Sequence, residues 1–549
     1  MTGTVSFSAS SLLVIMASVL MVSAVSAQPL SLEQLRETRR ELAHAPRRII
    51  ANNDGCDCLY FPRNIELTVQ SFLDRRTTGL VGSQVDTINY CSISSGFSNF
   101  THNTKLGTVL TRQSGDYGIL PKMRNVSQDL IDLDSDCLQS VVEFGHANDL
   151  EVFWSMRMND THDAAHTPEK PYLLYPPLKV EHPDWLISDH IKRTPQGRWS
   201  SINYALPEIR DLAFGYIEEV CRNYDVDGIE LDFFRHLCYF ASVANGGVAS
   251  QEELDMMTDL MQRIRAMTEE VGRERGRPIL VAIRVPDSVE FSRDMGFDLE
   301  RWMSEGLVDI LITTGYFRLN PWEYTVDLAH RYDVAAYPCL ADSRVKGESR
   351  FRRASIAGYR GRAMNAWAAG ADGLHTFNLF HPTSAIFREI GDPAGMATMN
   401  KLYFATVRDG NPNSWLAGGD SYRTIPILTP GNPMGLSAGK PLEVAVIVGE
   451  DIEAARAAGA EPTVVLHTEI PGIKRAEQVR VTLNDHELGE ATVADGWLDY
   501  PLSLEWLTRG ANRVTIELVA KELPGADEWS LVWDAADGEL PKAPFSRDP

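Results

Sequence analysis

The stretch Asp225-Val-Asp-Gly-Ile-Glu-Leu-Asp-Phe-Phe-Arg235 limits what this chain can fold into more than any other segment. With the period of two of a β-strand, it points three apolar side chains to one face and the carboxylates of Glu230 and Asp232 to the other. Carboxylates are costly to bury unless they are paired or used. A barrel strand suits this pattern, because helices cover its outer face and its inner face opens into a site at the C-terminal end.

Further short apolar stretches alternate with helical patterns on either side of this strand, and each is followed by polar or turn residues. Together they predict eight strands, at residues 48–53, 85–91, 151–158, 228–234, 279–285, 309–314, 334–340 and 373–378. Ser250–Glu253 forms a capping box at the start of one intervening helix. The alternation predicts an α/β fold, a (β/α)8 TIM barrel. An open doubly wound sheet is the alternative, but no glycine-rich dinucleotide motif follows the first strand.

The pattern changes beyond about Asp420. Apolar residues then alternate with polar ones in short segments that are separated by turn residues, with no long helical pattern. We therefore predict a (β/α)8 barrel over residues 28–419 and a β-sandwich accessory domain over residues 420–549. Trp497, Tyr500 and Trp506 would either form a sugar-stacking surface or fill the core of this domain, so glycan binding and structural support both stay open.

Residues 1–27 have the pattern of an export signal. An apolar run from Leu12 to Val22 precedes Val25-Ser-Ala27, which is a small-residue cleavage pattern. The segment contains no Lys or Arg, so an uncleaved membrane anchor is the alternative. We expect a periplasmic or extracellular protein with no stable membrane span after signal removal.

The charge argues against one class of partner, and the cysteine content indicates how most of the thiols are used. The 549 residues carry a formal net charge of −23, which argues against a nucleic-acid partner. The seven cysteines are scattered and odd in number, so at least one thiol is unpaired within the chain, and most are expected to be small core residues. No cofactor is predicted, and the sequence leaves the oligomeric state open.

Asp232 is the better candidate to contact a substrate at the mouth of the barrel. Inward residues of one strand are roughly 6.6 Å apart, so Glu230 would lie one layer deeper. There it would shift the pKa of Asp232 or bind a hydroxyl group of a sugar. The alternative is a buried ion-pair network in which both carboxylates balance inward arginines such as Arg157 and Arg284.

Polar residues recur at the same end of the other predicted strands. Such a cluster suits a polyol, because each hydroxyl needs a donor or an acceptor. The predicted substrate-binding residues are Asn89, Arg157, Asn159, His162, Arg235, Arg284, Tyr316, His375 and Asn378, and the candidate partner acids are Asp160, Asp287 and Asp342. His162 and His166 have metal-ligand spacing, but no third ligand accompanies them, so no metal site is predicted.

Two motifs carry a family resemblance. Asp227-Gly-Ile-Glu-Leu-Asp232, together with Arg157-Met-Asn-Asp160, resembles bacterial glycosyl hydrolase-like barrels of the family-10-glycosylhydrolase-like kind, over roughly Arg47 to Phe404. The Asp-Gly-x-x-x-Asp pattern is also similar to strand four of α-amylase and α-glucosidase type barrels, which implies Asp232 as nucleophile. Chitinases differ, because they place their acid where this chain has Phe234.

The residues and the resemblance lead to an expected function. We expect an exported glycoside hydrolase-like enzyme that cleaves O-glycosidic bonds in a poly- or oligosaccharide with two carboxyl groups. Asp232 would be nucleophile or base, and the acid stays open among Glu230, Asp160, Asp287 and Asp342. The alternatives are a non-catalytic glycan-binding protein on a degenerate barrel and a polysaccharide lyase.

Overall fold

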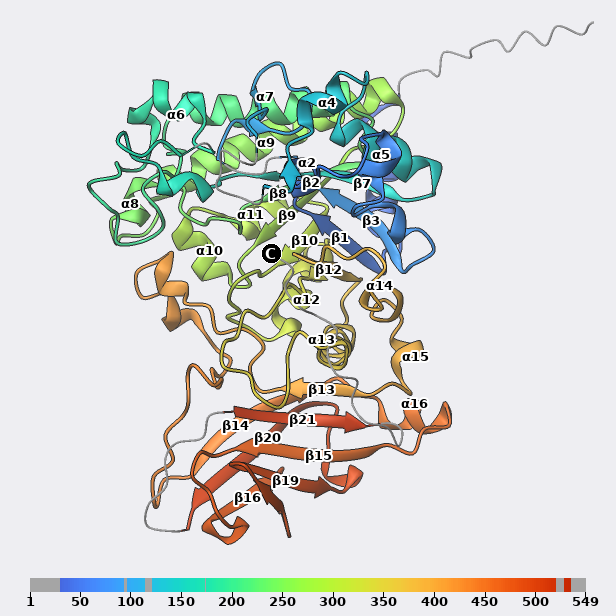
Figure 1. Ribbon diagram of the computed structural model, residues 1–549, viewed down its shortest axis with the longest axis vertical. Helices are drawn as coiled ribbons and strands as arrows, with labels where there is room; N and C mark the ends of the chain where they lie inside the picture. Colours follow the sequence, from blue (N-terminus) through green and yellow to red (C-terminus); the bar gives the residue numbers. More distant parts are fainter. Residues whose placement is uncertain (1–29, 93–95, 114–120, 173, 520–527, 535–549) are drawn as a thin grey trace, which may run out of the picture.

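The computed structural model describes residues 30–92, 96–113, 121–172, 174–519 and 528–534. These residues form a larger α/β part and a smaller β part, which follow one another along the long axis of the molecule (Figure 1). The predicted signal peptide, residues 1–27, lies outside the described residues. No helix in the described part of the chain is both long and apolar enough to cross a membrane.

Eight parallel strands form the centre of the α/β part, and each lies within one of the eight predicted strands. They are β1 (Ile49–Asn53), β3 (Val85–Tyr90), β7 (Glu151–Arg157), β8 (Gly228–Asp232), β9 (Leu280–Val285), β10 (Ile310–Thr313), β11 (Ala335–Pro338) and β12 (Leu374–Thr376). They neighbour one another in chain order, and β12 returns to pair with β1. A parallel bridge between Cys339 and His375 joins β11 to β12, so the sheet is nearly closed, as expected for a (β/α)8 barrel.

Helices cover the outside of this sheet. The capping box predicted at Ser250 is present and starts α9, whose buried face includes Leu254, Met257 and Met261. Pro207 begins α7, where its missing N–H costs nothing. The longer helices are α5 (Cys137–Ala147), α7 (Pro207–Asn223), α9 (Gln251–Arg275), α10 (Val289–Met295), α11 (Leu299–Ser304), α12 (Trp322–Arg331) and α13 (Ile356–Ala368).

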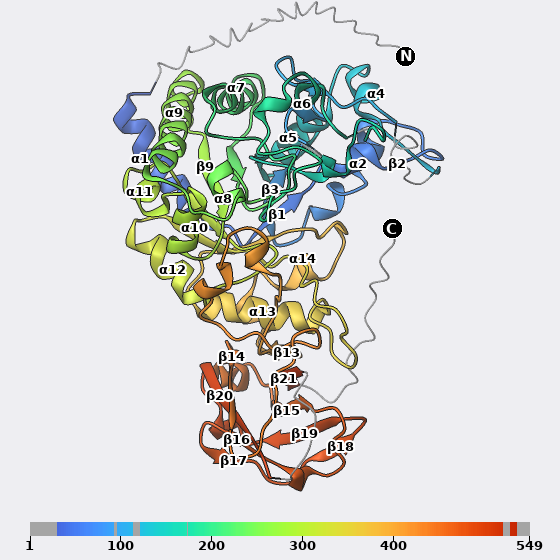
Figure 2. The same cartoon turned by 90° about the vertical axis from the view of Figure 1, so that its left-hand side faces the viewer.

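The lower half of the barrel interior is apolar. Ile50, Phe153, Leu280 and Tyr337 belong to one buried cluster there. The helix α1 (Leu32–Ala43) contributes Ala43 to the same cluster and packs beside α9 (Figure 2). Arg47, Thr87 and Glu151 form a hydrogen-bonded group at the same end, and the polar residues of the candidate site lie in the layers nearer the C-terminal ends of the strands.

Long excursions follow several strands at the C-terminal end of the barrel. The excursion after β7 contains α6 (Pro177–Glu181), and Lys179 of this helix forms a fully buried ion pair of 2.6 Å with Asp163. Trp199 is buried and donates to the carbonyl of Ala164. The remaining short elements are α2 (Cys56–Leu59), α3 (Val69–Leu73), α4 (Ser127–Ile131), α8 (Ala241–Ala244), α14 (Ile386–Glu389), α15 (Pro393–Met396), β2 (Phe61–Pro62), β4 (Asn99–Phe100), β5 (Thr108–Val109) and β6 (Met123–Arg124).

The C-terminal β part consists of two antiparallel sheets and the short helix α16 (Ile452–Ala457). One sheet contains β13 (Lys401–Phe404), β21 (Glu528–Asp534), β15 (Thr463–Glu469), β19 (Trp497–Leu502) and β18 (Thr492–Ala494). The other contains β14 (Leu442–Val448), β20 (Gly510–Leu518), β16 (Val479–Leu483) and β17 (His486–Glu487). The strand β13 precedes residue 420 and already pairs with β21, while the boundary at 419/420 stays a prediction.

The helix α13 connects the two parts, lying between the barrel strands and β13 (Figure 2). Gly361 of α13 approaches so closely that an added Cβ atom would lie 2.1 Å from the carbonyl oxygen of Leu402. Asn365 of the same helix accepts a hydrogen bond from the backbone N–H of Gly449. The β part is therefore packed directly on a barrel helix.

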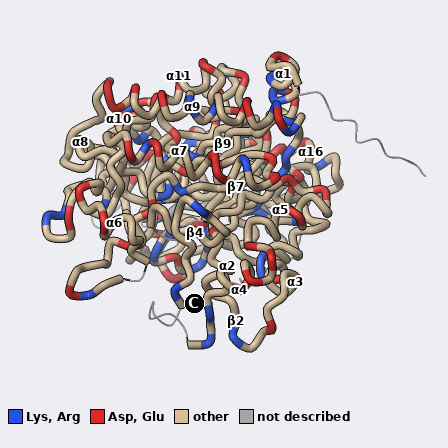
Figure 3. The backbone as a smooth tube through the Cα atoms, turned by 90° about the horizontal axis from the view of Figure 1, so that it is seen from above, with Lys and Arg blue, Asp and Glu red and all other residues tan. Residues whose placement is uncertain are grey.

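Most of the cysteines are small buried residues, as expected from the sequence. None of the seven cysteines forms a disulfide in the part of the chain that the structure describes, and all but Cys56 are buried. Seen from above, basic and acidic residues are interspersed along the described chain (Figure 3).

Candidate functional site

The ends of β7, β8 and β9 place three charged residues side by side at the barrel mouth. Asp232 aligns with Arg157 on one side and with Arg284 on the other. Asp232 is 1% exposed, and its Oδ2 lies 2.6 Å from Nη2 of Arg284. Its second oxygen, Oδ1, is buried without a partner among the described residues. A carboxylate with one oriented and one unpartnered oxygen is suited to contact a ligand.

Arg284 is positioned by its surroundings. Its guanidinium lies 4.0 Å from the ring centre of Phe377. A Cβ atom at Gly315 would lie 2.9 Å from Nη1, so a larger residue there would displace the guanidinium. Burial lowers the pKa of Arg284, but the opposing effect of Asp232 is strong enough that the net pKa lies above the usual value. Arg284 is thus a permanent cation that orients Asp232.

Glu230 lies one layer deeper and is fully buried. It accepts hydrogen bonds from Asn89 and from Ser155, the latter at 2.8 Å, and lies 3.2 Å from Nε2 of His375. Burial raises the pKa of Glu230, but His375 lowers it below its usual value. The structure therefore brings together the predicted residues Glu230, Asn89 and His375 in a layer beneath Asp232, although Oδ1 of Asn89 and Nδ1 of His375 have no partner among the described residues.

His375 has a second neighbour that the sequence interpretation overlooked. Burial would lower the pKa of His375, but Cys339 and Glu230 raise it to about 9. In turn, burial raises the pKa of the Cys339 thiol, yet His375 brings it below its ordinary value. The signal was available, because Cys339 ends the seventh predicted strand and lies in register with His375.

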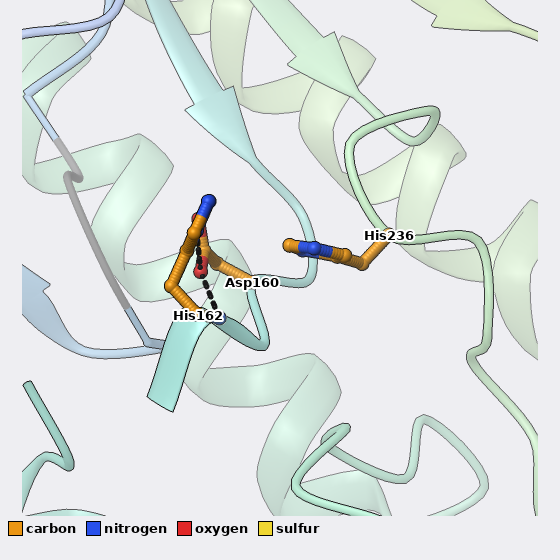
Figure 4. A group of neighbouring side chains, drawn as sticks. All are labelled: Asp160, His162 and His236. Atoms are coloured by element: carbon orange, nitrogen blue, oxygen red, sulfur yellow. Dashed lines mark hydrogen bonds and ion pairs between the residues drawn. The ribbon is translucent and has the colours of Figure 1, made fainter. Parts of the chain in front are cut away.

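Asp160, His162 and His236 form a cluster at the edge of the mouth (Figure 4). Asp160 is fully buried and accepts from Arg157 at 2.9 Å and from Nδ1 of His162 at 2.7 Å. Burial raises the pKa of Asp160, but His162 and Arg157 hold it well below its usual value. His236 was overlooked in the sequence, although it directly follows the predicted residue Arg235.

The ligand atoms of this cluster lie within 4.8 Å of one another, which is close enough for a metal ion. The hydrogen-bond directions do not suit one. The backbone N–H of Thr161 donates to Nδ1 of His236 at 3.0 Å, so the ring proton of the neutral imidazole is on Nε2. Nε2 of His162 already accepts from Arg235 at 2.5 Å. A ligating histidine instead donates its other ring N–H to an acceptor and keeps the ligating nitrogen free.

Arg235 extends the site away from Asp232. It donates to the hydroxyl of Tyr316, and its guanidinium lies 5.4 Å from the centre of that ring. Arg344, from the loop after β11, lies 4.5 Å from the centre of the same ring. Arg235, His162 and Tyr316 are three predicted substrate-binding residues that the structure places in contact.

Two predicted residues have their polar atoms engaged elsewhere. The carboxylate of Asp287 accepts the backbone N–H groups of Leu319 and Asn320, and burial raises its pKa. Asn159 donates to the carbonyl of Cys238 at 2.7 Å and accepts from the backbone N–H of Ile202. Both side chains connect loops in the structure.

The loops after β11 and β12 line a cavity of about 400 Å³. Its lining includes two predicted residues, Asp342 and Asn378, together with Arg344 and Phe380. Arg344 also contacts Tyr316, so this cavity borders the cluster around Arg235. The geometry thus defines an α/β-barrel protein with a charged site at the C-terminal face of the barrel.

Comparison with known proteins adds little to this description. No family profile matches the chain, and no curated protein matches it. Among solved structures, the glycoside hydrolase domain of PgaB (BpsB) from Bordetella bronchiseptica has a TM-score of 0.40 at 12% identity, covering 63% of this chain and 99% of that one. Alpha-L-fucosidase isoenzyme 2 from Paenibacillus thiaminolyticus has a TM-score of 0.39 at 12% identity, covering 87% and 100%.

The alpha-galactosidase AgaA from Geobacillus stearothermophilus has a TM-score of 0.35 at 11% identity. The match covers 92% of this chain but only 59% of the galactosidase, so this chain spans little more than half of that protein. These neighbours are glycosidases, but scores this low carry no argument about function. The interpretation of the site therefore depends on the residues of this chain.

Proposed function

We propose that this protein is a glycoside hydrolase-like enzyme that cleaves O-glycosidic bonds in an oligo- or polysaccharide. The observation that carries the proposal is the buried carboxylate of Asp232 at the C-terminal end of β8, with one oxygen held by Arg284 and the other unpartnered. Catalytic residues of barrel enzymes occupy this position. The proposal includes the resemblance to family-10-glycosylhydrolase-like barrels, export from the cell and a C-terminal β-sandwich.

Asp232 acts in this proposal as nucleophile or as the base that activates water. Of the candidate acids, Asp160 is held ionised by Arg157 and His162, and Glu230 by His375. Asp287 is enclosed by backbone N–H groups. This leaves Asp342, which lines the cavity beside Arg344, and we assign it the role of proton donor.

The test compares wild type with Asp232→Asn and Asp342→Asn on a panel of polysaccharides, with released sugars as the readout. Removing a group that transfers protons or attacks the substrate should lower kcat about 10²- to 10⁴-fold. Asp333→Asn is the matched control, because Asp333 is 72% exposed and lies outside the site. Equal product release by wild type and Asp232→Asn would refute the assignment of Asp232.

Glycan binding without hydrolysis is the second candidate, and one specific observation favours it. Asp232, Asp160 and Glu230 each lie within 3.2 Å of a basic side chain, as in the ion-pair network considered from sequence. Binding of oligosaccharides by wild type and Asp232→Asn alike, with no product from either, would identify the protein as a glycan-binding barrel.

A further inference from the structure

We propose that the barrel mouth recognises a negatively charged group on the glycan, namely the carboxylate of a uronic acid residue, and that Arg235 is the residue that binds it. This inference rests on the proposed function only in taking a glycan as the ligand. It concerns the charge of that glycan, and does not depend on whether the bond is cleaved.

Arg235 is a cation whose partners are neutral. Its Nη1 donates to the Tyr316 hydroxyl and its Nη2 to Nε2 of His162. Its Nε is buried and has no acceptor among the described residues. No described carboxylate lies within ion-pair distance of this guanidinium, in contrast to Arg157 and Arg284. Arg235 is half-buried, an unmet buried donor is costly, and a carboxylate is the acceptor that fits the planar geometry of the guanidinium.

The charges around Arg235 do not cancel. Arg157 is paired with Asp160, and Arg284 with Asp232, so these four groups balance one another. In the deeper layer the His375 imidazolium balances Glu230. Arg235 and Arg344, which lie against the same Tyr316 ring, are left without an ion-pair partner among the described residues, in a chain whose formal net charge is −23. A local cation in an acidic protein selects an anionic ligand over a neutral one.

The two histidines beside Arg235 are neutral, and the nearby carboxylate of Asp160 is already paired with Arg157. Burial lowers the pKa of His236, and Arg235 lowers it further, so the ring is neutral at pH 7. Because Nδ1 of His236 accepts from Thr161, its Nε2 carries a proton. Burial also lowers the pKa of His162, which lies against Arg235. Of the two histidines, only His236 therefore offers a ring N–H to an anion, because His162 already donates to Asp160 and accepts from Arg235.

The orphaned atoms mark where such a ligand would lie. Nε of Arg235, Nε of Arg284 and Oδ1 of Asp232 are all buried polar atoms without partners among the described residues. The two donors suit the acidic group and ring oxygens of a sugar, and the acceptor suits a hydroxyl group. Buried polar atoms are normally satisfied, so a sugar that reaches these three atoms would make hydrogen bonds that the protein itself leaves unmade.

The experiment measures binding of the full chain by calorimetry. The acidic probes are oligogalacturonate and alginate oligosaccharides, the neutral probes are galactan and mannan oligosaccharides of equal length, and a sulfated galactan tests the other anion. We expect uronate probes to bind about tenfold or more tightly than neutral ones, as for a charge-assisted hydrogen bond. This preference should shrink as salt rises from about 0.05 M to about 0.5 M.

Arg235→Gln should abolish the preference, whereas Arg235→Lys should retain part of it, because lysine keeps the charge and loses the planar fork. Arg222→Gln is the matched control, since Arg222 pairs with glutamates on the outer helices. Thermal unfolding of each variant verifies that it is folded. If Arg235→Gln unfolds, the Arg235→Lys variant carries the comparison.

Several outcomes separate this inference from the proposed hydrolase. Equal affinity for neutral and uronate probes, no binding of any uronate, or a preference for sulfate alone would overturn the assignment of a uronate. A preference that survives Arg235→Gln in folded protein would overturn the role of Arg235. Cleavage of a neutral glycan that depends on Asp232, with no binding of uronates, would support the proposed hydrolase and refute the inference. Arg235-dependent uronate binding with no cleavage of any glycan would support the inference and refute the proposed hydrolase.

Discussion

Nη2 of Arg284 lies 2.6 Å from Oδ2 of Asp232, across two adjacent strands of the barrel, while Oδ1 of Asp232 has no partner. One carboxylate oxygen is thus oriented by a charge that is itself held against Phe377. The other remains available to a ligand. Breaking this pair is costly, because neither group is hydrated and the remaining charge would be buried alone.

Removing Arg284 should destabilise the fold strongly. Arg284→Met leaves Asp232 as an unpaired buried charge, at a cost of about 3–5 kcal/mol in the free energy of unfolding. Urea unfolding measures this cost. The double variant Asp232→Asn/Arg284→Met should be less destabilised than the sum of the single variants, because no charge is stranded. Additive effects would show that the two side chains do not interact.

The contribution of His375 to stability should depend on pH. Its pKa of about 9 in the folded protein exceeds the value of about 6.5 in an unfolded chain. Such a group stabilises the fold fully below about pH 6.5 and loses this contribution as the pH rises towards 9. The stability gap between wild type and His375→Gln should therefore narrow by up to about 3 kcal/mol between these pH values. Unfolding at pH 6.5, 7.5 and 9 tests this, and a gap independent of pH contradicts it.

Asp287 should prove structural. Asp287→Ala strands the buried N–H groups of Leu319 and Asn320, at a cost of about 1–3 kcal/mol. Asp287→Asn keeps one acceptor oxygen and should lose less. The melting temperature measures both effects. If Asp287→Asn instead removes the alkaline limb of an activity–pH profile while the melting temperature is unchanged, Asp287 is the proton donor, because a general acid is active only while it is protonated.

The cluster in Figure 4 should not bind a transition metal tightly. Nδ1 of His236 accepts from Thr161, and Nε2 of His162 accepts from Arg235, so neither ring is arranged as a ligand. Stoichiometric Zn²⁺ or a chelator should leave the melting temperature unchanged. A zinc-dependent rise that disappears in both His162→Gln and His236→Gln would show that the cluster rearranges around a metal.

The contact between α13 and β13 should couple the two parts of the molecule. A methyl group at Gly361 would collide with the carbonyl oxygen of Leu402 at 2.1 Å, so Gly361→Ala should cost about 1–3 kcal/mol, although alanine favours helices. Gly435→Ala is the control, because nothing lies within 4 Å of a Cβ atom there. Calorimetry compares the two. Equal melting curves would mean that the two parts adjust to one another.

Much of the barrel was predictable because its signals are local. All eight observed strands lie within predicted ones, and the helix cap at Ser250 was identified from neighbouring residues. The period of two also placed Glu230 and Asp232 on one buried face. By contrast, Asp287 and Asn159 were predicted from position at a strand end, and their backbone partners lie on distant loops. Such partners leave no local pattern.

The sequence by itself therefore determined the strand segments, the order of helices and strands, and which residues face the barrel interior, because each depends on spacing along one segment. Only the tertiary structure decided which charge meets which. Asp232 pairs with Arg284 on the next strand, and Glu230 pairs with His375 on β12, four strands away around the barrel. Arg235 is left among neutral partners. These pairings depend on the register between strands and on loop positions, which arise from packing over the whole barrel.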